Sequence, residues 1–390
     1  MPSRRRFLQW SASGLAVHAF NAFAIERAPQ PPGRLIVVFL RGGFDGLFAL
    51  SPVSDPRLSE LRPSLSKTVL SQGTALGSTG FSAHPSAKAL ADLFASRELA
   101  FSPCAGTTDT SRSHFQAQDL FELGSGATHG ESGFMARAAQ ALSANSNAIS
   151  FTREVPLCFQ GGVRPPEIAP LSGSGLKLPE GRLLEAIRWA HRGQRTGDAL
   201  DQAIATEEQI QSAMGMEPQA ARGAPGANGL GRTAGTMGRI LRGNPRLALA
   251  FLDAGGVDTH ANEEGALSRV MASIGEGLVE LKTSLGDTEW RRTRVVMMSE
   301  FGRTVRENGT SGTDHGHGGL FLLAGGAIAG GRMIGDFRGL GDHALNDDRD
   351  LPVLADWRAL LAACLRDACG IPDSALNAIF PGRPQQNFAL

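Results

Sequence analysis

The amino-acid sequence predicts an α/β protein built on a doubly wound, mostly parallel β-sheet with helices on both faces. Two observations support this fold class. Apolar runs of about six residues without polar alternation recur along the chain, and such runs are typical of strands buried on both faces. These runs alternate with segments of helical periodicity, as expected when crossover helices join parallel strands.

The elements expected in the first half of the chain begin with a strand at 35–40, which ends in a Gly-rich turn. Next we expect a helix at 87–97, a strand at 99–104, a helix at 116–123, and short strands at 148–151 and 156–159. Helices at 180–192, 198–214 and 230–241, with a Gly-, Ala- and Pro-rich loop at 215–231, form a helical insertion over about 180–245 that we expect to cap the sheet.

The last part of the chain continues the alternation of strands and helices. Its apolar runs predict strands at 247–253, 294–299, 319–323 and 333–337, a long helix at 263–285 and a closing helix at 355–369. Together these elements predict a single α/β domain over residues 35–390, which is long enough to bury one extensive core.

Composition and charge exclude some classes of partner. The chain has 390 residues, and its 38 basic residues balance its 38 acidic ones, so nothing indicates nucleic acid or an anionic membrane surface as a partner. After the N-terminal region no apolar run reaches the roughly 18 residues of a spanning helix, so we expect no membrane span. Four cysteines allow disulfides in an exported protein, but Cys364 and Cys369 should face different sides of a helix.

The N-terminus carries the regions of an export signal in the right order. Three arginines at 4–6 precede a Phe-Leu pair, an apolar stretch covers 10–23, and small residues stand where a signal peptidase cleaves. Consecutive arginines followed by Phe-Leu resemble a twin-arginine signal. We expect a twin-arginine signal peptide at 1–24, a Pro-rich linker at 25–34, and a periplasmic or extracellular protein; a basic N-terminal tail is the alternative.

Acids and imidazoles collect where the predicted strands end. Parallel sheets bind ligands outside the carboxyl ends of their strands, so we expect these side chains to meet at one edge. Carboxylates mixed with imidazoles suit Zn, Mn or Fe, and crowded carboxylates repel one another unless a cation neutralises them. The sequence therefore predicts one or two divalent metal ions. The candidate ligands are Asp45, Asp258, His260, Glu300, Asp314, His315 and His317.

A nucleophile and an anion site are expected beside these ligands. Ser113, Thr107 or Thr108 lies in the turn before a predicted helix, where backbone N–H groups can hold an anion. Arg112 and Arg303 are the candidate partners for an anionic substrate group. The local sequence alone favours a helix N-cap as the role of Ser113, with the nucleophile as the alternative.

Structural roles remain open for several candidates. Asp45 suits a cap of backbone amides in its Gly-rich turn, and Asp253 suits a turn-shaping role. Glu300 suits an ordinary ion pair with Arg303, and the two histidines of the 314–317 loop can face opposite ways. Support for a metal site therefore comes from the convergence of several segments on one sheet edge.

Several segments resemble a known family over nearly the whole mature chain. They are IVVFLRGGFDGL at 36–47, SRSHFQAQDLFE at 111–122, DAGGVDTHAN at 253–262, MMSEFGRTVRENGTSGTDHGHGG at 297–319 and GGAIAGGRMIG at 325–335. With the twin-arginine start, they look like domain-of-unknown-function family 1501, a group of exported bacterial proteins whose activity is not settled.

The order of these motifs is similar, more distantly, to the alkaline phosphatase superfamily, which includes sulfatases and cofactor-independent phosphoglycerate mutases. That similarity implies an alkaline-phosphatase-like doubly wound sheet and two metals. The matching positions are Asp45, the nucleophile Ser113, Asp258 with His260, and His315 or His317. Glu300 and Phe301 stand where the superfamily has an Asp-His pair, and phenylalanine cannot bind a metal, so one metal site is weakened.

These observations lead to three hypotheses about function. The first is an exported, metal-dependent hydrolase acting on a small anionic substrate, a phosphate or sulfate ester. The second is a non-catalytic binding or scaffold protein with a protein partner and a degenerate metal site, which Phe301 supports. The third is a metal-dependent enzyme that does not hydrolyse esters.

Overall fold

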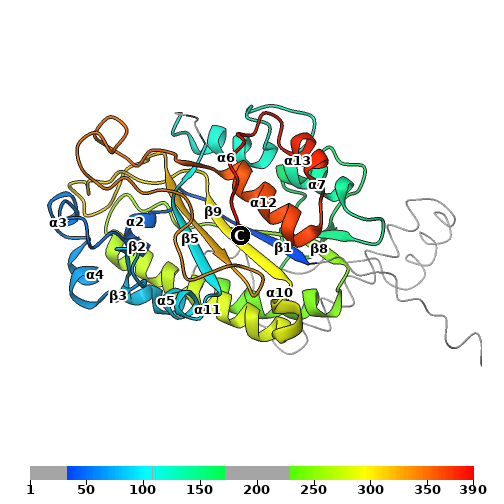
Figure 1. The fold of residues 1–390 in the computed structure, drawn as a ribbon, viewed down its shortest axis with the longest axis horizontal. Helices are drawn as coiled ribbons and strands as arrows, with labels where there is room; N and C mark the ends of the chain where they lie inside the picture. Colours follow the sequence, from blue (N-terminus) through cyan, green and yellow to red (C-terminus); the bar gives the residue numbers. More distant parts are fainter. Residues whose placement is uncertain (1–32, 108, 110, 172–228) are drawn as a thin grey trace, which may run out of the picture. The chain divides into compact units, whose positions relative to one another are not determined.

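The computed structural model describes residues 33–107, 109, 111–171 and 229–390. Several predicted features lie outside the described residues: the signal peptide, most of the linker, the helices at 180–192 and 198–214, and nearly all of the loop that follows them. Within the described part, two large hydrophobic layers lie on the two faces of one sheet (Figure 1).

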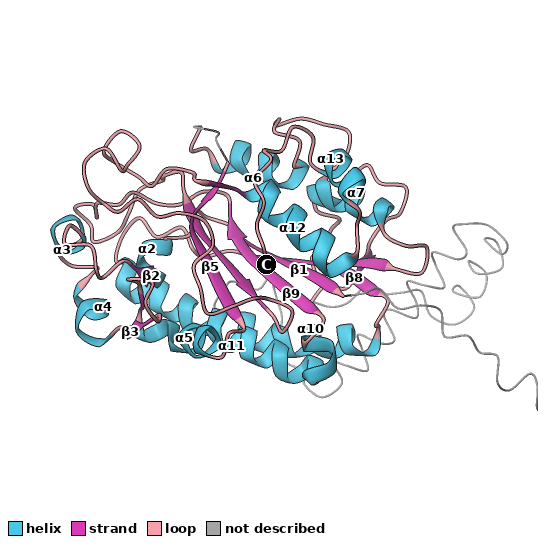
Figure 2. Cartoon of the chain, in the orientation of Figure 1, coloured by secondary structure: helices cyan, strands magenta, loops and turns pink. Residues whose placement is uncertain are grey.

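The core of the fold is an eight-stranded mixed sheet (Figure 2). Its strands are β1 (Arg34–Leu40), β5 (Leu99–Gly106), β6 (Asn147–Ser150), β7 (Glu167–Ile168), β8 (Leu247–Ala254), β9 (Thr293–Ser299), β10 (Gly319–Ala324) and β11 (Ala355–Asp356). They lie in the order β11-β5-β10-β9-β1-β8-β6-β7. All pairings are parallel except those of β10, which is antiparallel to both neighbours. The predicted mostly parallel sheet is confirmed.

β1 illustrates why an unbroken apolar run becomes a central strand. It pairs with β8 on one side and β9 on the other, and all of its residues are buried. Ile36 and Val38 pack into one hydrophobic layer, whereas Val37 and Phe39 pack into the other. Because burying each such side chain contributes roughly 1.5–3 kcal/mol, an apolar residue at every position stabilises a strand covered on both faces.

Helices cover both faces of this sheet. One face carries α5 (Lys88–Ala95), α10 (Leu230–Gly243) and α11 (Glu263–Trp290), and the other carries α6 (His114–Leu123), α7 (Phe134–Ala141), α12 (Trp357–Cys369) and α13 (Asp373–Ile379). α10, the described part of the expected insertion, packs along α11. Local signals set the helix ends: Asp356 caps α12 by accepting the N–H of Arg358, and Gly370, at φ 67°, ends it.

The chain between β1 and β5 forms short elements that the sequence did not predict. They are α2 (Gly46–Ala49), β2 (Leu50–Ser51), α3 (Leu58–Leu61), α4 (Lys67–Gln72), β3 (Thr74–Ala75), β4 (Ser82–Ala83) and η1 (Pro85–Ala87). β2, β4 and β3 pair as a small antiparallel sheet. Strands of two residues are too short to produce a periodic pattern, which is why sequence periodicity did not reveal them.

Two predicted strands are wrong. Residues 156–159 form a 3-10 turn, η2 (Leu157–Phe159), because the N–H of Cys158 donates to the buried Glu122 carboxylate instead of to a strand. Residues 333–337 make one bridge to Phe101 of β5 and then leave the sheet. Gly335 has φ 78°, a left-handed conformation that interrupts an extended strand, and Phe337 packs edge-on against Phe81, with ring centroids 4.9 Å apart.

The structure shows whether the four cysteines form disulfides. All four cysteines are free and buried, so the disulfides that their number allowed do not form in this structure. Burial raises the pKa of Cys364 and Cys369 to about 12, which keeps both thiols protonated.

Among the helices of the described ranges, none has the length and apolar character needed to cross a membrane.

Candidate metal centre

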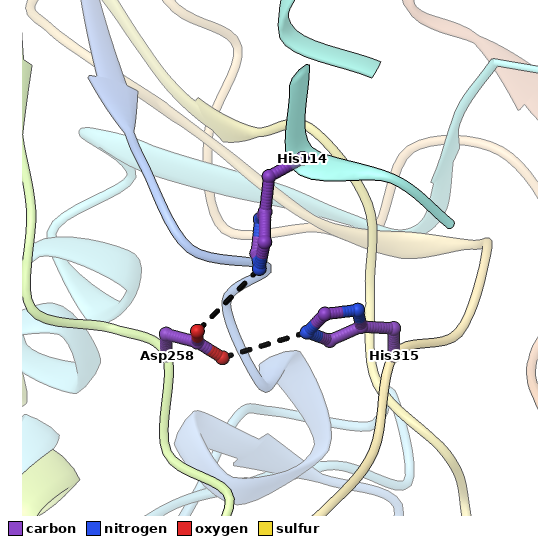
Figure 3. A group of neighbouring side chains, drawn as sticks. All are labelled: His114, Asp258 and His315. Carbon is purple, nitrogen blue, oxygen red and sulfur yellow. Dashed lines mark ion pairs between the residues drawn. The ribbon is translucent and has the colours of Figure 1, made fainter. Parts of the chain in front are cut away.

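Four side chains from three segments meet at the carboxyl edge of the sheet, and we call them the edge cluster. Asp258 and His260 follow β8, His114 is the first residue of α6, and His315 lies in the connection from β9 to β10. Ligand atoms of His114, Asp258 and His315 all lie within 4.8 Å of one another, and Figure 3 shows both imidazoles directed at the Asp258 carboxylate.

His114 is held so that one ring nitrogen faces the cluster. Its Nδ1 lies 2.8 Å from Glu300 Oε1, and this hydrogen bond raises the pKa of His114. Its Nε2 lies 3.4 Å from Asp258 Oδ2 and has no hydrogen-bond partner among the described residues. A carboxylate behind the far nitrogen of an imidazole is the usual arrangement for a metal-binding histidine.

Glu300, an expected ligand, lies behind His114. Its side chain is fully buried and accepts hydrogen bonds from the backbone N–H of Gly42 and from the side chains of Gln118 and Ser299. Burial favours the protonated acid, but the hydrogen bonds from His114 and Gln118 outweigh it and lower the pKa of Glu300. An ionised Glu300 with its oxygens already occupied orients His114 and has little capacity left for a metal.

His315 is oriented in the same way by a different acceptor. Its Nδ1 lies 3.1 Å from the carbonyl oxygen of Arg112, so Nδ1 carries the proton and donates it. The other nitrogen, Nε2, then has a lone pair and lies 3.5 Å from Asp258 Oδ1. Burial lowers the pKa of His315, and the charges of Arg303 and His114 lower it further, which favours the neutral, ligand-competent ring.

His260 completes the edge cluster from the outer side. Its Nε2 lies 3.0 Å from Asp258 Oδ1 and 3.0 Å from His315 Nε2. Two imidazole nitrogens approach this closely when they share a proton or when both address one cation. On its other side, His260 Nδ1 lies 3.3 Å from Asp314 Oδ1. Asp314, an expected ligand, is therefore placed behind His260.

Arg303 compensates the charge of Asp258 from the buried side of the edge cluster. The guanidinium is buried and donates to the carbonyl oxygens of Gly42, Gly43 and Thr313 as well as to Asp258. Burial opposes ionisation of Asp258, but the hydrogen bond and charge of Arg303 lower its pKa overall. Because its donors are used within the protein, Arg303 is fixed as part of the wall and is not free to bind a substrate anion.

Phe301, the departure from the superfamily pattern, packs against two members of the edge cluster. Its ring centroid lies 4.9 Å from that of His114 and 4.7 Å from that of His315. The phenyl ring thus provides an apolar surface that fixes the planes of both imidazoles.

The structure does not bring Asp45 and His317 into the edge cluster. Asp45 is buried, caps α2 through the N–H of Leu47, and forms an ion pair with Arg62. Burial opposes its ionisation, but the Arg62 charge lowers the pKa of Asp45. His317 Nδ1 bonds to Asp350, which also pairs with Arg112. Asp45 thus has a partner of opposite charge, and His317 has a carboxylate partner.

The candidate nucleophile Ser113 stands at the N-cap position of α6 but makes no side-chain cap hydrogen bond. Its hydroxyl therefore does not perform the structural role that the sequence also allowed. Thr107 accepts the N–H of Asp109 at 3.3 Å, and Thr108 lies outside the described residues. The remaining edge acid, Asp253, is paired with Arg41 at 2.8 Å.

The donor set can be tested against a metal from its chemistry alone. Two imidazoles have their Nδ1 atoms engaged by acceptors and their Nε2 atoms directed at a half-exposed carboxylate. Such a mixture of nitrogen and oxygen donors, with outer partners in place, fits Zn, Mn or Fe and disfavours Ca. His114, Asp258 and His315, with His260 beside them, are the residues that would hold the ion.

The family model described as "Protein of unknown function (DUF1501)" matches residues 101–383. The chain belongs to this family. No curated protein matches the chain. Among solved structures, one titled "Crystal structure of Ps i-CgsB" is 11% identical over 88% of this chain and 73% of its own, with a TM-score of 0.39, a likeness too slight to support an argument about fold or function.

Two residues of this DUF1501 chain were missed by sequence reasoning. His114 stands next to Ser113 in the Arg-Ser-His-Phe turn, and its place at the start of a helix that follows a strand was a usable signal. Asp350 lies in a polar loop among other acids, and no spacing in the sequence distinguishes it from its exposed neighbours.

Proposed function

We propose that this DUF1501 protein is a metal-dependent hydrolase that acts on a phosphate or sulfate ester. The observation that carries the proposal is the convergence of His114 Nε2 and His315 Nε2 on Asp258, each ring being held by an acceptor at its Nδ1. A single Zn, Mn or Fe ion in the edge cluster would neutralise Asp258 further. When bound, such an ion supplies Lewis-acid polarisation of an ester oxygen.

The residues around the edge cluster support the same proposal. Ser113 adjoins His114, and its hydroxyl is not used to cap α6, so it is available to attack phosphorus or sulfur. The first N–H groups of α6, which no Ser113 cap occupies, suit the oxygens of an anionic ester. The similarity of motif order to alkaline phosphatases supports an alkaline-phosphatase-like sheet, and the N-terminal sequence supports export by the twin-arginine route.

Elemental analysis of the full protein recovered from the periplasm tests the metal. We expect close to one Zn, Mn or Fe per chain, and a large loss of that metal in His114→Ala and Asp258→Ala. His129→Ala, which removes an exposed histidine outside the edge cluster, is the matched control and should retain the metal. Wild-type protein without metal, or equal metal in all variants, would contradict the proposal.

Turnover of an aryl phosphate and an aryl sulfate tests the chemistry. Ser113→Ala should lower the rate by roughly 10³-fold or more, because removal of a nucleophile costs several powers of ten. Ser111→Ala changes an exposed serine of the same turn, which donates to Asp109, and should keep most of the activity. Full activity of Ser113→Ala would exclude the nucleophile assignment.

A second function is favoured by one observation, the packing of Phe301 against both imidazoles at a position where the superfamily has a ligand. In that case the edge cluster holds a structural ion in a binding or scaffold protein. Metal retained at full occupancy, with no turnover of either ester and no effect of Ser113→Ala, would favour this function or a metal enzyme of another reaction class.

A further inference from the structure

Asp350 is a fully buried acid at the meeting point of three segments of the site. Its Oδ2 accepts a hydrogen bond from His317 Nδ1. Its Oδ1 lies 3.3 Å from Arg112 Nη2 and 3.2 Å from Arg349 Nη1. No role follows for Asp350 from the edge cluster alone, because it is not a candidate ligand there.

Asp350 is connected to the edge cluster by two chains of contacts, which we call its two arms, and the first runs through Arg112. The backbone carbonyl of Arg112 is the acceptor that fixes His315 Nδ1, at 3.1 Å, and His114 follows two residues later. Arg112 has φ 51°, a left-handed conformation that is uncommon and strained for a residue with a side chain. Asp350 is the charge partner of this residue, whose carbonyl contacts His315.

The other arm reaches the edge cluster through the loop that carries His315. His317 is anchored on Asp350, and Gly316 is packed so closely that an added Cβ would lie 2.9 Å from Asp350 Cβ. The N–H of Gly316 also donates to the carbonyl of Gly302 at 2.8 Å. The position of His315 is therefore set by its neighbours on both sides.

A small cavity lies beside both arms. Arg112 Nε and His317 Nε2 are buried without a protein partner in the described ranges, and both residues line a cavity of about 10 Å³. That volume holds about one water molecule. Because the Asp350 carboxylate is fully buried, its ion pair with Arg112 is less screened than a pair between two exposed side chains.

We propose that Asp350 is the positioning residue of the metal centre, acting through Arg112 and His317 to hold His114 and His315 at ligand geometry. This inference rests on the metal site of the proposed function. It does not require any particular substrate, because it concerns how the ligands are held before a substrate binds.

The test is metal affinity of the full chain, measured with Zn²⁺, together with the visible absorption spectrum of the Co²⁺-loaded protein. Asp350→Asn keeps the shape of the side chain and removes its charge. We expect its Zn²⁺ affinity to fall about 10- to 100-fold, the range for loss of an outer partner, and the Co²⁺ spectrum to change.

Glu98→Gln is the matched control. Glu98 is also a hydrogen-bonded carboxylate, with Lys282 at 2.6 Å and Trp290 at 2.7 Å, but it precedes β5 at the opposite edge of the sheet. A general loss of stability would affect both variants, whereas loss of positioning lowers metal affinity only in Asp350→Asn.

The outcomes separate this inference from the proposed function. If wild-type protein binds no metal, the proposed function fails and this inference fails with it. If wild type binds and Asp350→Asn matches Glu98→Gln in affinity and spectrum, only the positioning role is overturned. Should Asp350→Asn not fold, Arg112→Met decides, because that side chain is partly exposed; wild-type affinity in it overturns the proposal.

Discussion

Two groups of ionisable side chains lie near the same edge of the sheet, and they are neutralised in opposite ways. Asp45, Arg62 and Glu263 form an interior cluster, in which the protein itself supplies every compensating charge or proton. In the edge cluster three imidazoles surround one carboxylate, and His114 Nε2 has no hydrogen-bond partner among the described residues. The contrast shows that close packing of acids does not by itself indicate a metal.

In the interior cluster each acid has a partner within the protein. Asp45 receives two guanidinium nitrogens of Arg62, and both side chains are almost completely buried. Glu263 is held protonated: burial, and then the negative charge of Asp45, raise its pKa to about 9. This cluster has no capacity for a cation, which is why Asp45 is a poor candidate ligand despite its place after β1.

In the edge cluster the side chains are accessible and incompletely paired. The side chains of Asp258 and His260 are 44% and 46% exposed, enough for an ion to enter from solvent. His114 Nε2 lacks a hydrogen-bond partner in the part of the chain that the structure describes. Access together with unpaired nitrogen atoms, and not acidity, therefore distinguishes the candidate metal centre.

The largest expected effect is on the interior cluster. Arg62→Met leaves Asp45 buried without its partner and should lower the free energy of unfolding by about 3–5 kcal/mol, the usual cost of breaking a buried ion pair. Chemical denaturation of the metal-free protein measures it. Arg57→Met, which removes surface ion pairs with Glu60 and Asp342, is the control and should leave stability almost unchanged. Similar losses in both would contradict an interior role for Arg62.

A smaller effect is expected where Glu300 supports the edge cluster. Glu300→Gln removes the charge behind His114 and should weaken Zn²⁺ binding about 10- to 100-fold, with little change in fold. Titration with a competing chelator measures it. Glu122→Gln alters a neighbouring buried acid that pairs with Arg41 and the N–H of Cys158, so its metal affinity should stay at the wild-type value. Unchanged affinity in Glu300→Gln would show that His114 does not need the negative charge of Glu300.

A third effect is a pH dependence of stability that originates in Glu263. Its folded pKa of about 9 lies above the ordinary value of 4.5, so its contribution is complete below pH 4.5 and declines as pH rises towards 9. Between these values the folded state binds more protons than the unfolded state, and unfolding free energy should fall by up to about 1.4 kcal/mol per pH unit. Denaturation curves at pH 6, 7 and 8 measure this slope.

Glu263→Gln supplies the control for that slope. Glutamine keeps a hydrogen-bonding amide towards Asp45 and an oxygen towards Thr313 Oγ1, but it does not titrate. The variant should therefore lose the decline between pH 6 and pH 8. An equally steep decline in wild type and variant would assign the effect to another group.

Much of the fold could be predicted because it depends on local burial. The apolar run at 35–40 became the central strand β1, and the runs at 247–253 and 294–299 became its partners β8 and β9. The segment at 333–337 is interrupted by Gly335, at φ 78°, and by Asp336, and after one bridge to Phe101 it leaves the sheet. Where the chain turns there depends on contacts from elsewhere in the fold, such as that of Phe337 with Phe81.

The site was predicted less completely, for a similar reason. Asp258, His260 and His315 were candidates because they follow strand ends, and the structure places them together. Glu300 met the same criterion, but Gln118 and the N–H of Gly42, both distant in sequence, occupy its oxygens. Whether a carboxylate is free to bind a metal depends on its hydrogen-bond partners, and these are known only from the folded structure.

The reversal of β10 has a consequence for how this family could diversify. Because β10 runs against β9, the 19-residue connection at 300–318 leaves and re-enters the sheet at the same rim. Insertions there would not have to cross either layer of helices or shift the pairing of the strands. The connection can therefore be lengthened, in evolution or by design, to change which ligands reach this edge of the sheet. The strands of the sheet would keep their order and pairing.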